Sequence, residues 1–183
     1  MSTVFIGGSR RVSCLPKEAK HWLDDWVEEN CSVLVGDANG ADKVLQKYLY
    51  DRHYDHVTVY CSGKFCRNNI GEWNTRCVDV SGSKRDFQFY TAKDREMADK
   101  AEVGLMIWDG ESPGTFRNVL HLAGASKKAI LIWPKNQVYT LENENGLNSF
   151  IQELPISLRE NLEQKLQTEW PSSLSKQEEL ELT

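Results

Sequence analysis

The stretch MIWDGESPGTFRNV, residues 106–119, decides the fold. Its apolar run stops at Asp109 and Gly110, a Pro-Gly-Thr turn follows, and a helical pattern then begins. A buried strand that passes through a glycine-containing loop into a helix is typical of parallel α/β proteins. The stretch therefore predicts a strand–loop–helix unit with an acidic residue where the strand ends.

The same unit repeats outward from this stretch, because short apolar runs alternate with amphipathic patterns. The expected strands are residues 3–6, 32–35, 56–60, 75–80, 103–108 and 129–133. Helices are expected after Pro16, around Val44, and over residues 87–101 and 114–125. Strands that are buried on both faces give unbroken apolar runs of this kind. We therefore predict an α/β fold with a doubly wound, largely parallel sheet.

The pattern weakens after Pro134. Residues 137–154 indicate an edge strand or a short helix, and residues 158–170 indicate an amphipathic helix. The tail from Pro171 is rich in serine and glutamate and is expected to be disordered. We divide the chain into a domain of residues 1–155 and a C-terminal helical extension with its tail, residues 156–183. The extension could dock on its own domain or on a second subunit.

Composition restricts the class of partner. The 183 residues are 40% hydrophobic and 27% charged, as in soluble globular proteins, and the net charge is -5. This acidic balance argues against a nucleic-acid partner, whereas backbone N–H groups can still hold a small anion.

No apolar run approaches the roughly 18 residues of a membrane-spanning helix, and no signal-peptide pattern is seen. We expect a cytoplasmic protein without a membrane partner.

The five cysteines form no regular framework, so reduced thiols are expected. Cys61, Cys66 and Cys77 suggest a metal site. However, the C-x4-C spacing is wider than that of zinc knuckles, and no histidine pair completes the set. We therefore predict no metal ligands and no cofactor.

Glycine-rich loops follow several of the expected strands. They are GGSR (7–10), GDANGAD (36–42), CSG (61–63) and DGESPGT (109–115). Ligands of parallel sheets bind outside the carboxyl ends of the strands, where glycines admit them and helix N-termini attract phosphate. The predicted binding residues in these loops are Gly7, Gly8, Ser9, Arg10, Gly36, Gly40, Asp42, Gly110, Ser112, Gly114 and Thr115. Turn geometry and helix capping would explain any one loop taken alone, and capping is an open alternative for Asp37.

The motifs FIGGSR, GDANGAD and YTAKDREMADKAEVGLMIWDGESPGT resemble, in order and spacing, those of the SLOG superfamily. These are Rossmann-like domains related to the DNA-processing protein DprA and the LOG-type phosphoribohydrolases. The similarity covers residues 3–133 and is closest to the YpsA-like branch, also labelled DUF2493. The resemblance implies a Rossmann-like fold, a homo-oligomer, and a nucleotide or nucleotide-derived ligand whose phosphate is held by Gly114 and Thr115.

The resemblance is weaker at the catalytic positions. LOG-type enzymes cleave the bond between a base and ribose 5'-monophosphate with an arginine and a PGGxGTxxE glutamate. Here Lys93 falls at the position of that arginine and Asn118 at that of the glutamate. Asn118 would bind and orient the sugar, so a carboxylate must come from elsewhere, with Asp37, Asp94 and Asp109 as candidates.

We therefore expect nucleotide binding, with hydrolysis or transfer at the N-glycosidic bond as the hypothesis for catalysis. Asp37, Lys93 and Asp109 are the predicted catalytic residues. The alternative is a non-catalytic nucleotide sensor or binding module. Single-stranded DNA binding ranks last, because of the net charge.

Overall fold

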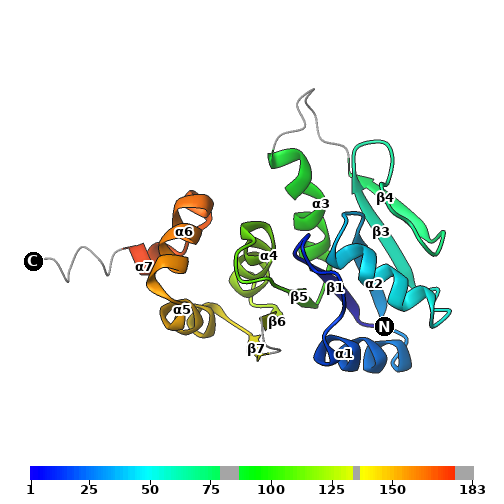
Figure 1. Ribbon diagram of the computed structural model, residues 1–183, viewed down its shortest axis with the longest axis horizontal. Coiled ribbons are helices and arrows are strands. Elements are labelled where there is room, and N and C mark those ends of the chain that lie inside the picture. The colour runs from blue at the N-terminus through cyan, green and yellow to red at the C-terminus, as the bar shows by residue number, and fades with distance from the viewer. Residues whose placement is uncertain (79–86, 134–136, 176–183) are drawn as a thin grey trace, which may run out of the picture.

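The computed structural model describes residues 1–78, 87–133 and 137–175 (Figure 1). Its strands are β1 (Thr3–Gly8), β2 (Ser32–Gly36), β3 (Val57–Ser62), β4 (Asn74–Val78), β5 (Val103–Ile107), β6 (Lys128–Trp133) and β7 (Gln137–Leu141). They form one sheet in the order β4-β3-β2-β1-β5-β6-β7. Neighbouring strands from β4 to β6 are parallel, and β7 is antiparallel to β6. The predicted largely parallel sheet is confirmed.

Helices cover both faces of the sheet (Figure 1). The helices are α1 (Lys17–Glu28), α2 (Ala41–Tyr50), α3 (Phe87–Lys100), α4 (Pro113–Gly124), α5 (Glu144–Glu153), α6 (Ile156–Leu166), a 3-10 helix η2 (Gln167–Glu169) and α7 (Ser172–Ser175). One core cluster joins α1 and α2 to sheet residues such as Ile6 and Val35. The other joins α3 and α4 to residues such as Phe5 and Met106 on the opposite face. The predicted doubly wound arrangement is therefore also confirmed.

The strand order reverses beside β1. The chain first builds outward from β1 through β2, β3 and β4, and then returns to place β5 on the other side of β1. In open α/β sheets such a reversal leaves a crevice at the carboxyl ends of the two strands. The strands meet closely there, since a Cβ on Gly8 would lie 2.3 Å from the carbonyl oxygen of Ile107. Glycine is required at this point of contact.

The C-terminal part contains more regular structure than expected. Residues 137–154, for which an edge strand or a short helix was expected, form both, first the edge strand β7 and then the helix α5. The expected helix over 158–170 ends at Leu166 and continues as η2. The expectation of disorder from Pro171 is wrong for α7, and the rest of that tail, residues 176–183, lies outside the described residues, as do residues 79–80 of the fourth expected strand.

The C-terminal extension docks on its own domain. Leu162, Leu166 and Trp170 belong to the same buried cluster as Phe116 of α4. The rings of Phe116 and Trp170 are stacked, with centroids 6.3 Å apart. This is the first of the two docking arrangements that the sequence left open.

Two further expectations concern membranes and cysteines. No helix in the described ranges is long and apolar enough to cross a membrane.

Cys61 and Cys66 are paired as a disulfide, whereas Cys14, Cys31 and Cys77 are free. The expectation of reduced thiols is therefore wrong for one pair, because the loop after β3 returns Cys66 to the strand that carries Cys61.

Candidate functional site

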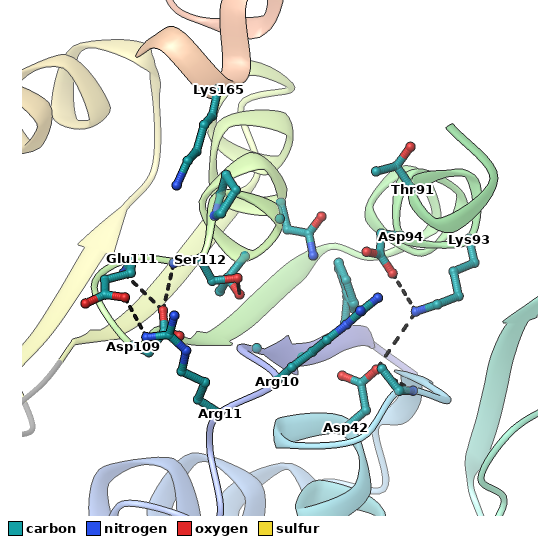
Figure 2. A pocket seen from close by; sticks show the side chains of 18 of the residues that line it. Arg10, Arg11, Asp42, Thr91, Lys93, Asp94, Asp109, Glu111, Ser112 and Lys165 are labelled. Atoms are coloured by element: carbon teal, nitrogen blue, oxygen red, sulfur yellow. Dashed lines mark hydrogen bonds and ion pairs between the residues drawn. The ribbon is translucent and has the colours of Figure 1, made fainter. Parts of the chain in front are cut away.

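A cleft of about 520 Å³ opens at the carboxyl ends of β1 and β5 (Figure 2). It lies at the point where the strand order reverses, which is where ligands of such sheets bind. Ten of the predicted site residues line it: Gly7, Gly8, Arg10, Asp42, Lys93, Asp109, Ser112, Gly114, Thr115 and Asn118. The sheet edge therefore brings together residues from three separate loops and from α3.

One side of the cleft, here called the amide wall, consists of residues 109–115. The Asp109 carboxylate holds this loop, because its Oδ1 accepts hydrogen bonds from the backbone N–H groups of Glu111 at 3.0 Å and Ser112 at 2.8 Å. Gly114 follows in the first turn of α4, where backbone N–H groups have no carbonyl partner within the helix. A Cβ on Gly114 would meet no described heavy atom within 4 Å. The N–H groups of Glu111 and Ser112 are thus used within the loop, and Gly114 and Thr115 are the wall residues whose N–H groups lie in the first turn, at the positive end of a helix dipole.

Ser9 fastens the amide wall to β1. Its hydroxyl lies 3.0 Å from Thr115 Oγ1 and accepts a hydrogen bond from the backbone N–H of Asp109 at 3.1 Å. Ser9 is only 1% exposed and stands behind the cleft surface. Its position indicates that it orients the wall rather than contacting a ligand directly.

The opposite side, here called the ionic wall, consists of Asp42, Lys93 and Asp94 (Figure 2). The Lys93 ammonium lies 2.7 Å from Asp94 Oδ1 and 3.9 Å from Asp42 Oδ2. Asp42 Oδ2 also accepts a hydrogen bond from the backbone N–H of Ala38 at 3.1 Å. Gly36 stands behind this cluster, since a Cβ there would lie 2.2 Å from Asp42 Oδ2. A glycine at this position leaves room for the ion cluster.

Burial and neighbouring charges set the protonation of the ionic wall. Burial raises the pKa of Asp42 to about 6, with Lys93 opposing the shift and Asp94 adding to it. Burial alone would lower the pKa of Lys93, but the charges of Asp94 and Asp42 outweigh it and raise that pKa. Asp42 is therefore a carboxyl group inside the cleft that can both give and take a proton near neutral pH.

Asp37 was expected to reach into the cleft, but its side chain is bound to Arg67 instead. Its carboxylate accepts hydrogen bonds from the Arg67 guanidinium at 2.6 and 2.9 Å and from the Arg67 backbone N–H at 3.0 Å. Burial would raise the pKa of Asp37, but these hydrogen bonds outweigh burial and lower it. Asp37 is 1% exposed and is not among the residues that line the cleft, whereas Arg67 is.

The remaining predicted glycines shape the backbone. Gly40 and Gly110 have φ angles of 85° and 83°, a region that favours glycine. A Cβ on Gly40 would also lie 2.3 Å from the backbone oxygen of Arg10. Together with Gly36, these residues lie beside the cleft rather than on its surface.

Sequence reasoning missed several polar residues that line the cleft, among them Arg11, Thr91 and Lys165. Arg11 forms an ion pair with Glu111 across the cleft mouth at 2.5 Å. Lys165 is directed from α6 toward the cleft (Figure 2). Arg11 could have been found next to Arg10, but Lys165 carries no signal in the sequence because only the docking of α6 brings it near.

Comparisons with known proteins support the fold alone. No protein-family model matches the sequence, and no curated protein matches it significantly. The structure is similar to DNA processing protein A from Helicobacter pylori, for which a single-stranded DNA binding mode is described. The two chains are 14% identical, the match covers 91% of this chain and 81% of that one, and the TM-score is 0.52. The chain thus has a Rossmann-like α/β fold, and its place in the YpsA-like branch stays a prediction.

Proposed function

We propose that this protein binds a nucleotide or nucleotide-derived molecule, with its phosphate on the amide wall. The observation that carries the proposal is the open first turn of α4 at the point where the strand order reverses. Backbone N–H groups and the helix dipole favour an anion there, and Gly114 leaves the space it needs.

The size and charge of the cleft support the same ligand class. Its volume of about 520 Å³ is within the range of small-molecule sites. Arg10, Arg11 and Lys165 line it, and so do the carboxylates of Asp42 and Asp94. Cations suit a phosphate and carboxylates accept hydrogen bonds from sugar hydroxyls, so the mixture suits a sugar phosphate better than a bare anion.

The proposed binding unit is residues 1–155, to which residues 156–183 contribute Lys165. A homo-oligomer is part of the proposal, and sedimentation of the full chain and of a version that ends at Pro155 measures it. If the shortened chain alone loses self-association, α6 takes part in the subunit contact.

A thermal-shift panel of nucleoside monophosphates, ADP-ribose, NAD and cyclic nucleotides tests binding. A true ligand at a hundredfold excess over its Kd should stabilise the chain by about 2.7 kcal/mol. Gly114→Val should abolish this gain, because its side chain fills the space for phosphate. Gly124→Val is the matched control, since Gly124 lies at the other end of α4 and a Cβ there also meets nothing within 4 Å. The absence of any ligand-induced shift, or equal effects of both variants, would refute the proposal.

Hydrolysis or transfer at the N-glycosidic bond is the second candidate function, and the raised pKa of Asp42 favours it. Breaking this bond passes through an oxocarbenium-like state, in which a group of this kind protonates the leaving base or activates water. Asp42 therefore takes the acid–base role. The Lys93 ammonium stabilises the ionised form of the Asp42 carboxyl. Asp109 has one carboxylate oxygen occupied by the loop, and Asp37 would act indirectly by positioning Arg67.

Chromatographic detection of free base tests this reaction. Asp42→Asn should slow base release by about 10²–10⁴-fold, the usual contribution of a positioned acid–base group, while the nucleotide still binds. Asp37→Asn and Asp109→Asn report on the two carboxylates chosen from sequence. If the natural chain binds a nucleotide and releases no base, the protein is a sensor or binding module.

Single-stranded DNA is the alternative ligand, because the structural neighbour binds it. A gel shift at low salt tests this alternative. Affinity that falls steeply with added salt would indicate contacts to a phosphate backbone and would favour DNA over a free nucleotide.

A further inference from the structure

Three cysteine sulfurs lie together near the carboxyl ends of β3 and β4. Cys61 on β3 and Cys77 on β4 are register partners in the parallel pair, so their side chains share one face of the sheet. The Cys77 sulfur lies 3.1 Å from the Cys61 sulfur. Cys66 comes from the loop between the strands, and the three sulfurs all lie within 4.8 Å of one another.

The loop that brings Cys66 to the strands is held on both sides. Gly63 turns the chain with a φ of 85°, and its N–H donates to the carbonyl oxygen of Val78 at 3.1 Å. On the other side of Cys66, Arg67 is bound to the buried Asp37 carboxylate through its backbone and its guanidinium. Cys66 is therefore positioned before any ligand arrives, which lowers the entropic cost of binding.

We propose that the reduced chain binds one Zn²⁺ ion through the thiolates of Cys61, Cys66 and Cys77. Soft thiolates are among the ligands that Zn²⁺ takes in tetrahedral sites, and three protein ligands leave one position of the tetrahedron open. Cys61 is buried, Cys66 is half-buried and Cys77 is exposed, so the cluster opens to solvent on one side. The fourth position is therefore left to water or to an external ligand. The cysteines do not line the cleft, so this inference does not rest on the proposed function.

The Cys61–Cys66 disulfide is the oxidised, metal-free form of the same cluster. A dithiol or phosphine reductant supplies two electrons, and two protons convert the disulfide into two thiols. With Cys77 this makes three thiols, and Zn²⁺ binding then releases three protons as the thiolates form. The disulfide and the metal thus exclude one another.

The test uses the full chain, reduced with a phosphine under nitrogen. Thiol titration should rise from three groups to five on reduction, as the free and total cysteines require. The reduced chain should then take one equivalent of Zn²⁺ from a chromophoric chelator and release protons. Co²⁺ should give the thiolate charge-transfer absorption of a tetrahedral site. The oxidised chain should bind neither metal at this site.

Cys77→Ser and Cys66→Ser should each lose stoichiometric binding, whereas Cys14→Ser, at an exposed free cysteine elsewhere, should retain it. Far-UV circular dichroism of the metal-free variants checks that they fold. Three outcomes would overturn the proposal: five free thiols without stoichiometric metal binding, binding that survives Cys77→Ser, or a Cys61–Cys66 disulfide that persists after the phosphine.

Discussion

The two walls of the cleft present polar groups of different kinds. The amide wall presents backbone N–H groups, held in place by the Asp109 carboxylate and by hydrogen bonds such as that between Ser9 and Thr115. The ionic wall presents charged side chains, and those of Lys93 and Asp42 are only 5% and 9% exposed. The backbone N–H donors of the amide wall do not titrate at moderate pH, whereas the ionic wall changes with the protonation of Asp42.

The amide wall is therefore suited to binding an anion, and the ionic wall is suited to exchanging a proton with it. Fixed N–H donors stabilise an anion without gaining or losing a proton. A buried carboxyl group with a pKa of about 6 is poorly suited to permanent anion binding but well suited to proton exchange. Four variants test whether stability responds to charge on the ionic wall and to hydrogen bonding on the amide wall.

Lys93→Met should have the largest effect. It leaves the Asp42 and Asp94 carboxylates without their shared cation, and breaking a buried ion pair from one side costs about 3–5 kcal/mol. Urea unfolding at pH 8 measures the loss, which should shrink at pH 5 because Asp42 is then protonated. Lys47→Met is the control, since Lys47 pairs with Asp51 on the surface. Equal losses of stability in the two variants would show that the buried ion pairs of Lys93 contribute no more than the exposed pair of Lys47.

Asp42→Asn should change stability in the opposite direction. The pKa of Asp42 is raised from 3.8 to about 6 in the folded chain, so the folded state binds more protons between these values. The free energy of unfolding therefore falls as the pH rises through this window. At about 1.36 kcal/mol per pKa unit, the neutral variant should be up to about 3 kcal/mol more stable than the natural chain at pH 8. Below pH 3.8 the two should become equally stable.

Asp37→Asn supplies the control of opposite sign. The pKa of Asp37 is lowered in the folded chain, so its contribution is present above pH 3.8 and is lost as the pH falls through its folded value. This variant should be less stable than the natural chain at pH 8. A destabilised Asp42→Asn at the same pH would contradict the assignment of Asp42 as a strained buried charge.

Ser9→Ala should have an intermediate effect. It removes the hydrogen bonds of the hydroxyl with Thr115 and with the Asp109 N–H, each worth about 0.5–1.5 kcal/mol. The loss should be the same at pH 5 and pH 8, because no group in these bonds changes its charge there. Ser149→Ala, on the exposed face of α5, should alter stability little. A loss from Ser9→Ala that varies with pH would show that the walls are coupled.

Arg11→Ala should have the smallest effect on stability. The side chains of Arg11 and Glu111 are 72% and 65% exposed, and exposed ion pairs contribute little. The unfolding midpoint should not change measurably. Ligand-induced stabilisation should nevertheless fall, because a cation leaves the mouth of the cleft. A large shift of the midpoint would mean that the Arg11–Glu111 ion pair stabilises the fold of the amide wall.

Much of the fold could be predicted from hydrophobic patterns. The run at 103–108 predicted β5 (Val103–Ile107), and the turn after it predicted a helix from Gly114, which begins one residue earlier as α4 at Pro113. Most of the ten predicted residues that line the cleft follow strands, and the carboxyl ends of parallel strands meet at one edge of the sheet. The strand order itself, and hence the neighbours of β1, has no local signal.

By itself, the sequence determined the alternation of strands and helices and the polar loops at the strand ends, because side-chain periodicity and turn chemistry act over a few residues. The tertiary structure alone decided that Asp42 faces the cleft while Asp37 binds Arg67, thirty positions along the chain. It also brought Lys165 to the cleft and Cys77 to the other two cysteines of the cluster. The direction of a side chain at the end of a strand depends on the partners that packing supplies, and those partners come from distant parts of the chain.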